Sequence, residues 1–203
     1  MSEINRLISI DIEPGGRTKP VGTIGIAEIG DTQILSDFLM RFRSPLFKGS
    51  QSHLDHPSFA ESWQYLDAFI DESTLTSYGY GYDMKALKAL LQADGFDVPD
   101  YTFLDGKTTL NRVRRKQIGD LQTVASELLF TDNEIKQKKA IWKLNPEKYD
   151  KVILHNAQDD AVANAMIFTE VIFPETGTNC STILSYPQVA LKSLKTRASS
   201  IHS

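Results

Sequence analysis

The amino-acid sequence predicts an α/β protein in which an opening run of strands is followed by alternating helices and strands. Three observations indicate this fold class. Three apolar segments with strand character follow one another near the start, later segments carry apolar residues at helical spacing, and short apolar segments lie between those helices. The chain has 203 residues, 41% of them hydrophobic and 24% charged. A chain of this size buries about 70% of its unfolded surface, so we expect one domain over residues 1–173, followed by an extension over 174–203.

The first three elements are expected to be strands at residues 7–12, 22–29 and 34–42. Turn signals separate them, because Pro14–Gly15–Gly16 follows the first segment and Gly30–Asp31 follows the second. Short turns join strands that lie side by side and run in opposite directions. The segment therefore predicts an antiparallel meander.

A helix is expected over residues 59–70, where apolar residues repeat at helical spacing. Ser58 can act as its N-cap, and Glu61 three residues later completes a capping box. A strand over 75–80 and a helix over 83–93 come next. The remaining expected elements are a strand at 101–104, a basic helix at 108–117, a helix at 121–129, a Lys-rich helix opening at 131–134, a strand at 152–154 and a helix at 157–172.

Two carboxylates, Asp11 and Glu13, lie at the end of an apolar segment that otherwise reads as a buried strand. A buried charge is costly without a partner, and no basic residue alternates with these acids, so a divalent cation is the expected partner. The alternative is a strand that runs out into solvent with two surface acids. A second group favours the cation, because His155 follows a short apolar strand and Asp160 lies five residues later in an expected helix. A strand end and a first helical turn place such side chains at one edge of a sheet, where ligands of open α/β sheets bind.

Asp159 competes with Asp160 as the functional acid of that helix. With Asn156 as N-cap, Asp159 falls at the third helical position, where a carboxylate satisfies backbone N–H groups and complements the helix dipole. Asp160 has no such structural explanation.

Together these residues resemble the DEDDh 3′-5′ exonucleases, a family that includes ribonuclease T and polymerase-proofreading enzymes. Asp11 and Glu13 match its first motif, D-x-E, Asp83 is similar to the second, and His155–Ala161 fits the third, H-x-A-x-x-D-A. The resemblance covers roughly residues 5 to 173. It implies a ribonuclease H-like fold, a mixed sheet of about five strands flanked by helices. The sequence departs from the family at Pro14, where many relatives carry a small hydroxyl residue, and its second motif lacks the His-Asn pair that is common before the Asp in proofreading enzymes.

The resemblance also implies an activity, a cofactor and a role for each residue. The activity is removal of nucleotides from the 3′ end of single-stranded or 3′-overhanging nucleic acid, with RNA and DNA both open. Two Mg²⁺ or Mn²⁺ ions are the implied cofactors. Asp11 would bridge both ions, Glu13 and Asp160 would bind the one that carries the attacking water, and Asp83 would complete the second site. His155 would be the general base.

Charge is segregated along the chain, whose net charge is −4. Residues 1–106 hold 8 basic and 16 acidic side chains, whereas residues 107–151 hold 11 basic and 6 acidic ones. A basic segment beside a carboxylate cluster suits an enzyme that cleaves a polyanion. We therefore expect nucleic acid to contact the basic part of the helix at 108–117, namely Arg112, Arg114, Arg115 and Lys116. The alternative is that these residues form a solvated helix face.

Ser and Thr make up 10 of the 30 residues in the extension, 174–203. Such a composition favours a segment that is mobile or packed on the domain. Gln188–Leu194 resembles a peptide that docks on a sliding clamp, which would give the extension a protein partner. A small helix packed on the domain is the preferred interpretation.

Other features bound the class of protein. The single cysteine, Cys180, excludes a disulfide within the chain and suits a reducing compartment. No apolar run has the length of a membrane span, and the N-terminal residues match neither a secretory nor a transit sequence, so a cytoplasmic protein without membrane contact is expected. Two other functions stay open: a module that binds nucleic acid or a protein partner without turnover, and a metal-dependent phosphohydrolase of small nucleotides.

Overall fold

The structure is a computed structural model that describes residues 6–51, 54–79, 81–124, 129, 156–183 and 191–193, with only the backbone at residues 122 and 191–193. The expected strand at 152–154, the expected Lys-rich helix and His155 lie outside the described residues. The expected helix at 121–129 is described as a helix over Leu121–Val124.

One mixed sheet organises the molecule. In the described part of the chain it has six strands in the order β3-β2-β1-β4-β5-β6. Neighbours are antiparallel in the pairs β1–β2, β2–β3 and β5–β6, and parallel in the pairs β1–β4 and β4–β5. This arrangement confirms both the α/β fold class and the opening meander. The strands are β1 Leu7–Glu13, β2 Val21–Ile29, β3 Ile34–Arg43, β4 Thr74–Ser77, β5 Thr102–Asp105 and β6 Leu191–Ser193.

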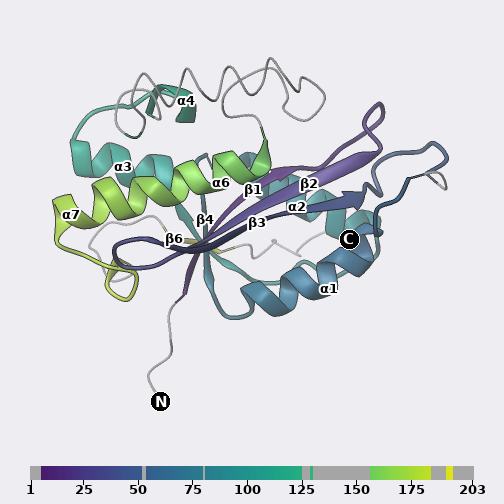
Figure 1. The fold of residues 1–203 in the computed structure, drawn as a ribbon, viewed down its shortest axis with the longest axis horizontal. Helices are drawn as coiled ribbons and strands as arrows, with labels where there is room; N and C mark the ends of the chain where they lie inside the picture. The colour runs from purple at the N-terminus through teal and green to yellow at the C-terminus, as the bar shows by residue number, and fades with distance from the viewer. Residues whose placement is uncertain are drawn as a thin grey trace, which may run out of the picture.

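Helices cover both faces of this sheet (Figure 1). On one face lie α1 and α2, whereas α3, α6 and α7 lie on the other. The predicted capping box at the start of α1 is present, because Ser58 Oγ accepts from the Glu61 N–H and the Ser58 N–H donates to the Glu61 carboxylate. The helices are α1 Phe59–Ile70, α2 Gly81–Ala93, α3 Gly106–Arg114, α4 Leu121–Val124, α6 Ala157–Met166, a π-helix (η2) Ile167–Ile172 and α7 Phe173–Thr176.

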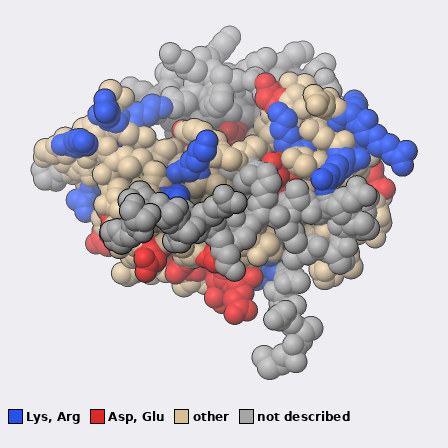
Figure 2. Space-filling model, turned by 180° about the vertical axis from the view of Figure 1, so that it is seen from behind, with Lys and Arg blue, Asp and Glu red and all other residues tan. Residues whose placement is uncertain are grey.

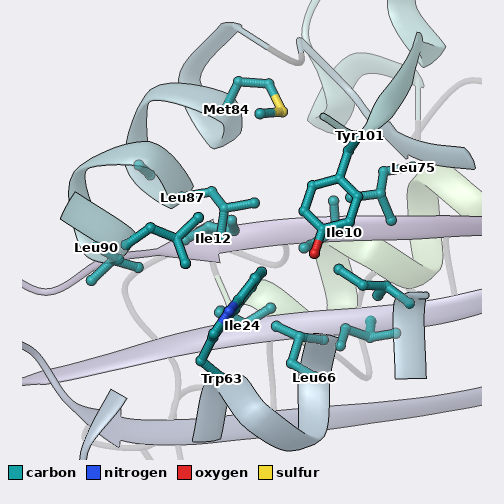
Figure 3. Packing of buried hydrophobic residues seen from close by; sticks show 14 of the residues in the cluster. Ile10, Ile12, Ile24, Trp63, Leu66, Leu75, Met84, Leu87, Leu90 and Tyr101 are labelled. Atoms are coloured by element: carbon teal, nitrogen blue, oxygen red, sulfur yellow. The ribbon is translucent and has the colours of Figure 1, made fainter. Parts of the chain in front are cut away.

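The face under α1 and α2 carries the larger apolar cluster. Every second residue of β1 points into it, as the two-residue period of a strand requires. In Figure 3, Trp63 and Leu66 of α1 converge with Leu87 of α2 on Ile10 and Ile12 of β1. These side chains are buried and hold both helices against the sheet.

The opposite face is covered by α3, α6 and the segments that follow α6. Leu104 of β5, Leu110 of α3 and Phe168 of η2 are fully buried there. Ile183, beyond α7, is buried in the same cluster. The first part of the extension therefore packs on the sheet.

Two expected helices differ in the structure. The predicted helix 157–172 is α-helical only to Met166, continues as the π-helix Ile167–Ile172, and then becomes α7. The small helix expected within Gln188–Leu194 is wrong, because Leu191–Ser193 is the edge strand β6, paired antiparallel with β5. Hydrophobic spacing did not reveal that the edge of β5 offers backbone groups for a further strand.

The extension also contacts the turn between β2 and β3. The Cys180 N–H donates to Asp31 Oδ1 at 3.0 Å, and the Cys180 thiol donates to the Ile29 carbonyl at 2.9 Å.

The division into a domain and an extension at residue 173 stays a prediction. No helix in the ranges given above is long and apolar enough to span a membrane.

Candidate active site

Asp11 and Glu13 lie on the face of the sheet that α6 covers. Alternate residues of a strand point to opposite faces, and Ile10 and Ile12 of β1 point toward α1 and α2. Ser9, two residues before Asp11, accepts a hydrogen bond from Asn164 of α6. Asp11 and Glu13 therefore project toward the start of α6, at the end of β1.

Gly25 allows α6 to approach the sheet beside Asp11. Gly25 is paired with Asp11 across β1 and β2. A Cβ atom at Gly25 would lie 1.8 Å from the Ala157 carbonyl oxygen, far inside van der Waals contact. The first residue of α6 thus rests on the backbone of β2, and any larger side chain would displace it.

The cap of α6 assigns different roles to the two neighbouring aspartates. Asn156 Oδ1 accepts from the Asp159 N–H at 2.9 Å, and Asn156 Nδ2 donates to Asp159 Oδ2 at 2.8 Å. Asp159 is engaged in the cap, as the sequence predicted. Asp160 lies in the same first turn, and its charge acts on Asp11.

Asp83 joins the site from the start of α2. Because β1 and β4 are parallel, the end of β1 and the segment that leads from β4 into α2 meet at one edge of the sheet. Pairing between these strands ends at Ser9 and Thr76, and beyond it the Ile12 N–H donates to Asp83 Oδ1 at 3.0 Å. The Asp83 carboxylate thus accepts a β1 backbone hydrogen bond that a neighbouring strand would otherwise accept. Asp83 is buried, with 3% of the residue exposed.

The charges of three of these acids act on the ionisation of the fourth, Asp11. Burial raises the pKa of Asp11 well above its ordinary value, and the charges of Asp83, Asp160 and Glu13 raise it further. Burial also raises the pKa of Asp83 to about 6, although the hydrogen bond from the Ile12 N–H opposes the shift. The structure therefore brings together four of the five residues singled out in the sequence, while His155 lies outside the described residues.

The donor chemistry of this cluster suits a hard divalent cation. Carboxylate oxygens are the ligands that Mg²⁺ and Mn²⁺ prefer, and a cation would offset both the burial of these charges and the repulsion between them. Within the described ranges, no three His, Cys, Asp or Glu side chains already form a group compact enough to hold a metal ion. The charges of Glu13, Asp83 and Asp160 nevertheless act on Asp11, so the four acids lie near one another.

Three further residues lie beside the cluster or close to it. Asn164, one turn after Asp160, is buried and donates through Nδ2 to Ser9 Oγ at 2.9 Å and to Thr76 Oγ1 at 3.5 Å. In the sequence, the only sign of this hydrogen-bond network was the presence of polar residues within apolar strands.

Tyr82 is 60% exposed. Its pKa is raised first by burial and then by Glu13, Asp83 and Asp11, while Lys19 lowers it. Tyr82 therefore borders the acids, and Lys19 lies near Tyr82.

The predicted basic residues lie away from the acids, at the end of α3. At the upper right of Figure 2, Lys and Arg side chains gather over the end of the molecule where α3 lies. Arg112, Arg115 and Lys116 line an open hollow of about 380 Å³. Arg114 instead forms an ion pair with Glu175 of α7, with 2.7 Å between Nη2 and Oε1.

Comparison with known proteins identifies a solved structure with a similar fold. No protein-family model matches the sequence, and no curated protein matches it either. Among solved structures, the chain is similar to Exonuclease X in complex with 5′ overhanging duplex DNA, with a TM-score of 0.50 and 14% sequence identity. The match covers 86% of this chain and 95% of that one. The chain therefore has a ribonuclease H-like α/β fold of the kind found in that exonuclease, a mixed sheet flanked by helices, as the sequence predicted.

Proposed function

We propose that this protein is a metal-dependent 3′-5′ exonuclease that hydrolyses the terminal phosphodiester bond of single-stranded or 3′-overhanging nucleic acid. The observation that carries the proposal is the meeting of Asp11, Glu13, Asp83 and Asp160 at one edge of the sheet, with raised pKa values at Asp11 and Asp83. The likeness in fold to an exonuclease bound to DNA supports a nuclease. Acids whose pKa values are raised by burial and by neighbouring acids are typical of functional sites.

Each acid has a role in holding metal. Two bound Mg²⁺ or Mn²⁺ ions would supply charge neutralisation at the scissile phosphate and an activated water. Asp11, the residue on which the other three charges act, would bridge both sites. Glu13 and Asp160 would complete one of them, and Asp83, held by the Ile12 N–H, would complete the other.

His155 would accept the proton of the attacking water. It directly precedes Asn156, the N-cap of α6, and an imidazole has an ordinary pKa of about 6.5. This pKa lies close to neutral pH, where a general base is most effective.

Tyr82 would hold the base of the terminal nucleotide. Its ring is largely exposed although it borders the acids, and an exposed aromatic face can stack on any base. Lys19, whose charge reaches Tyr82, would face a backbone phosphate. Stacking on one ring does not distinguish RNA from DNA.

The test is incubation with 5′-labelled single-stranded RNA and DNA in Mg²⁺, Mn²⁺ or EDTA. We expect a ladder of products shortened one nucleotide at a time from the 3′ end, and no products in EDTA. Cutting of a circular single strand would contradict an exonuclease. Hydrolysis of nucleoside triphosphates without hydrolysis of strands would identify a small-nucleotide phosphohydrolase, and binding without cutting would identify a binding module.

A further inference from the structure

The hollow at the end of α3 has the chemistry of a phosphate-binding site. Three of its six lining residues are basic and none is acidic; the lining consists of Thr108, Asn111, Arg112, Arg115, Lys116 and Gln117. The three basic side chains are exposed. Arginine in particular presents several N–H donors in a geometry that matches phosphate oxygens.

The local backbone brings these side chains together. Arg115 ends α3 in the left-handed conformation, with φ 50° and ψ 31°, which a residue other than glycine adopts at some cost. The Lys116 N–H then bonds to the Asn111 carbonyl, and the Ile118 N–H bonds to Asn111 Oδ1 at 2.7 Å. The chain thus folds back over the last helical turn and places Lys116 beside Arg112. Basic residues at a helix end also complement the helix dipole, but that effect requires no hollow.

The distance from the hollow to the acids follows from two contacts between α3 and the helical run that starts with α6. Gly106, the first residue of α3, lies against Asn164, where a Cβ atom would come 2.2 Å from Oδ1. Arg114, the last residue of α3, is paired with Glu175. The hollow therefore lies beside Glu175, fifteen residues after Asp160 along this run. At about 1.5 Å per helical residue, this separation is about 20 Å.

A nucleic acid strand can span this separation on one face of the protein. Both α3 and α6 cover the same face of the sheet (Figure 1). Successive phosphates of a helical strand are about 3.4 Å apart along the axis, so about 20 Å corresponds to about six nucleotides. A shorter strand that keeps this helical rise, with its 3′ end at the acids, would not reach the hollow.

We propose that the hollow lined by Arg112, Arg115 and Lys116 binds a backbone phosphate about six nucleotides from the 3′ end held at the carboxylate cluster. This inference rests on the proposed function and adds a substrate class to it: strands of more than six nucleotides, as opposed to dinucleotides or free nucleotides. Arg114 takes no part in this contact, because Glu175 already neutralises it.

The test compares strands of four and twelve nucleotides on the wild-type protein and on Arg112→Glu and Lys116→Gln. Lys88→Glu, on α2 at the opposite face of the sheet, is the control matched in charge to Arg112→Glu. We expect Arg112→Glu to raise KM for the twelve-nucleotide strand about tenfold with kcat unchanged, and to leave KM for the four-nucleotide strand unchanged. Lys116→Gln, outside the helix, should act in the same direction without disturbing α3. An unchanged KM for the longer strand in both variants would overturn the proposal.

Binding in EDTA separates this inference from the proposed function. Fluorescence anisotropy of the labelled twelve-nucleotide strand measures affinity without hydrolysis. We expect Lys116→Gln to weaken binding and to reduce the slope of log Kd against log salt by about 0.7, the value for one phosphate contact in a single strand. This result with an inactive protein would support the hollow and contradict the exonuclease. A polyglutamate peptide of equal charge that competes as well as the strand would overturn the nucleic acid assignment.

Discussion

At the scale of single residues, the neighbouring aspartates Asp159 and Asp160 have different surroundings and therefore different roles. Both are aspartates in the first turn of α6, yet Asp159 makes two hydrogen bonds with the N-cap Asn156: its N–H donates to Asn156 Oδ1, and its Oδ2 accepts from Asn156 Nδ2. Asp160 is instead one of the charges that raise the pKa of Asp11. The same side chain thus closes a helix end at one position and would bind metal at the next.

Asp160→Asn should abolish activity and weaken metal binding together. The change removes a charged ligand, so single-turnover hydrolysis should fall at least about 100-fold, and calorimetric titration should show weaker binding of Mn²⁺. Asp159→Asn is the matched control, and it should cost only about 0.5–1 kcal/mol of stability through the cap. The ligand assignment is wrong if Asp159→Asn abolishes metal binding and Asp160→Asn does not.

Gly25 is the residue that sets the distance between α6 and β1. We expect Gly25→Ala to destabilise the protein by about 1–3 kcal/mol, because the added Cβ would meet the Ala157 backbone, which cannot rotate away as a side chain can. Activity should fall as well, since Asp160 moves with the helix.

Urea unfolding measures this loss. Gly81→Ala is the control, because a Cβ at Gly81 meets nothing within 4 Å and Gly81 has no positive φ. Equal stability of Gly25→Ala and Gly81→Ala would show that the start of α6 does not rest on β2.

At the scale of elements, the rotation of α6 about its axis decides where Asp160 points. Asn164 lies four residues later, on the same side of the helix, and bonds Ser9 of β1 and Thr76 of β4. One buried amide therefore bridges two strands and a helix. This bridge lies one helical turn from the acids.

Asn164→Leu should lower kcat by about tenfold or more while leaving KM within about twofold. The variant keeps the size of the side chain but loses both hydrogen bonds, which costs about 1–3 kcal/mol and frees α6 to turn. A purely structural role would lower the melting temperature without this split between kcat and KM.

A double-mutant cycle with Ser9→Ala isolates the bridge. We expect a coupling energy of about 0.5–3 kcal/mol for residues in direct contact. Independent, additive losses would show that Asn164 does not act through Ser9.

At the scale of the whole molecule, the acid cluster makes stability depend on pH and on metal. The pKa of Asp83 is raised to about 6, above its ordinary value of 3.8, and that of Asp11 is also raised. At a pH between 3.8 and about 6, Asp83 binds more protons in the folded protein than in the unfolded chain. Stability from these groups is therefore present at low pH and is lost as the pH rises through about 6.

In EDTA, we expect the melting temperature to be a few degrees higher at pH 5.5 than at pH 7.5. Asp83→Asn should reduce this difference, because its amide does not titrate. At pH 7.5, Mn²⁺ should raise the melting temperature of the wild-type protein by binding the folded state. A wild-type protein in EDTA that is less stable at pH 5.5 than at pH 7.5 would contradict the raised pKa values.

The sequence alone determined the α/β class, the opening meander, the cap of α6 and the choice of Asp11, Glu13, Asp83 and Asp160. These features depend on local order: strand and helix periods, turn residues and caps act over a few neighbouring residues. The motif spacing then pointed to residues that the fold brings to one edge.

Only the tertiary structure showed which side chains lie beside the site and which predicted residues contact other parts of the protein. Asn164, Gly25 and the hollow on α3 depend on contacts between segments far apart in the chain, and local patterns carry no record of them. The same reason explains why Arg114, equal to its neighbours in sequence, is paired with Glu175. It also explains β6, because a strand at a sheet edge forms where a neighbouring strand offers unpaired backbone groups.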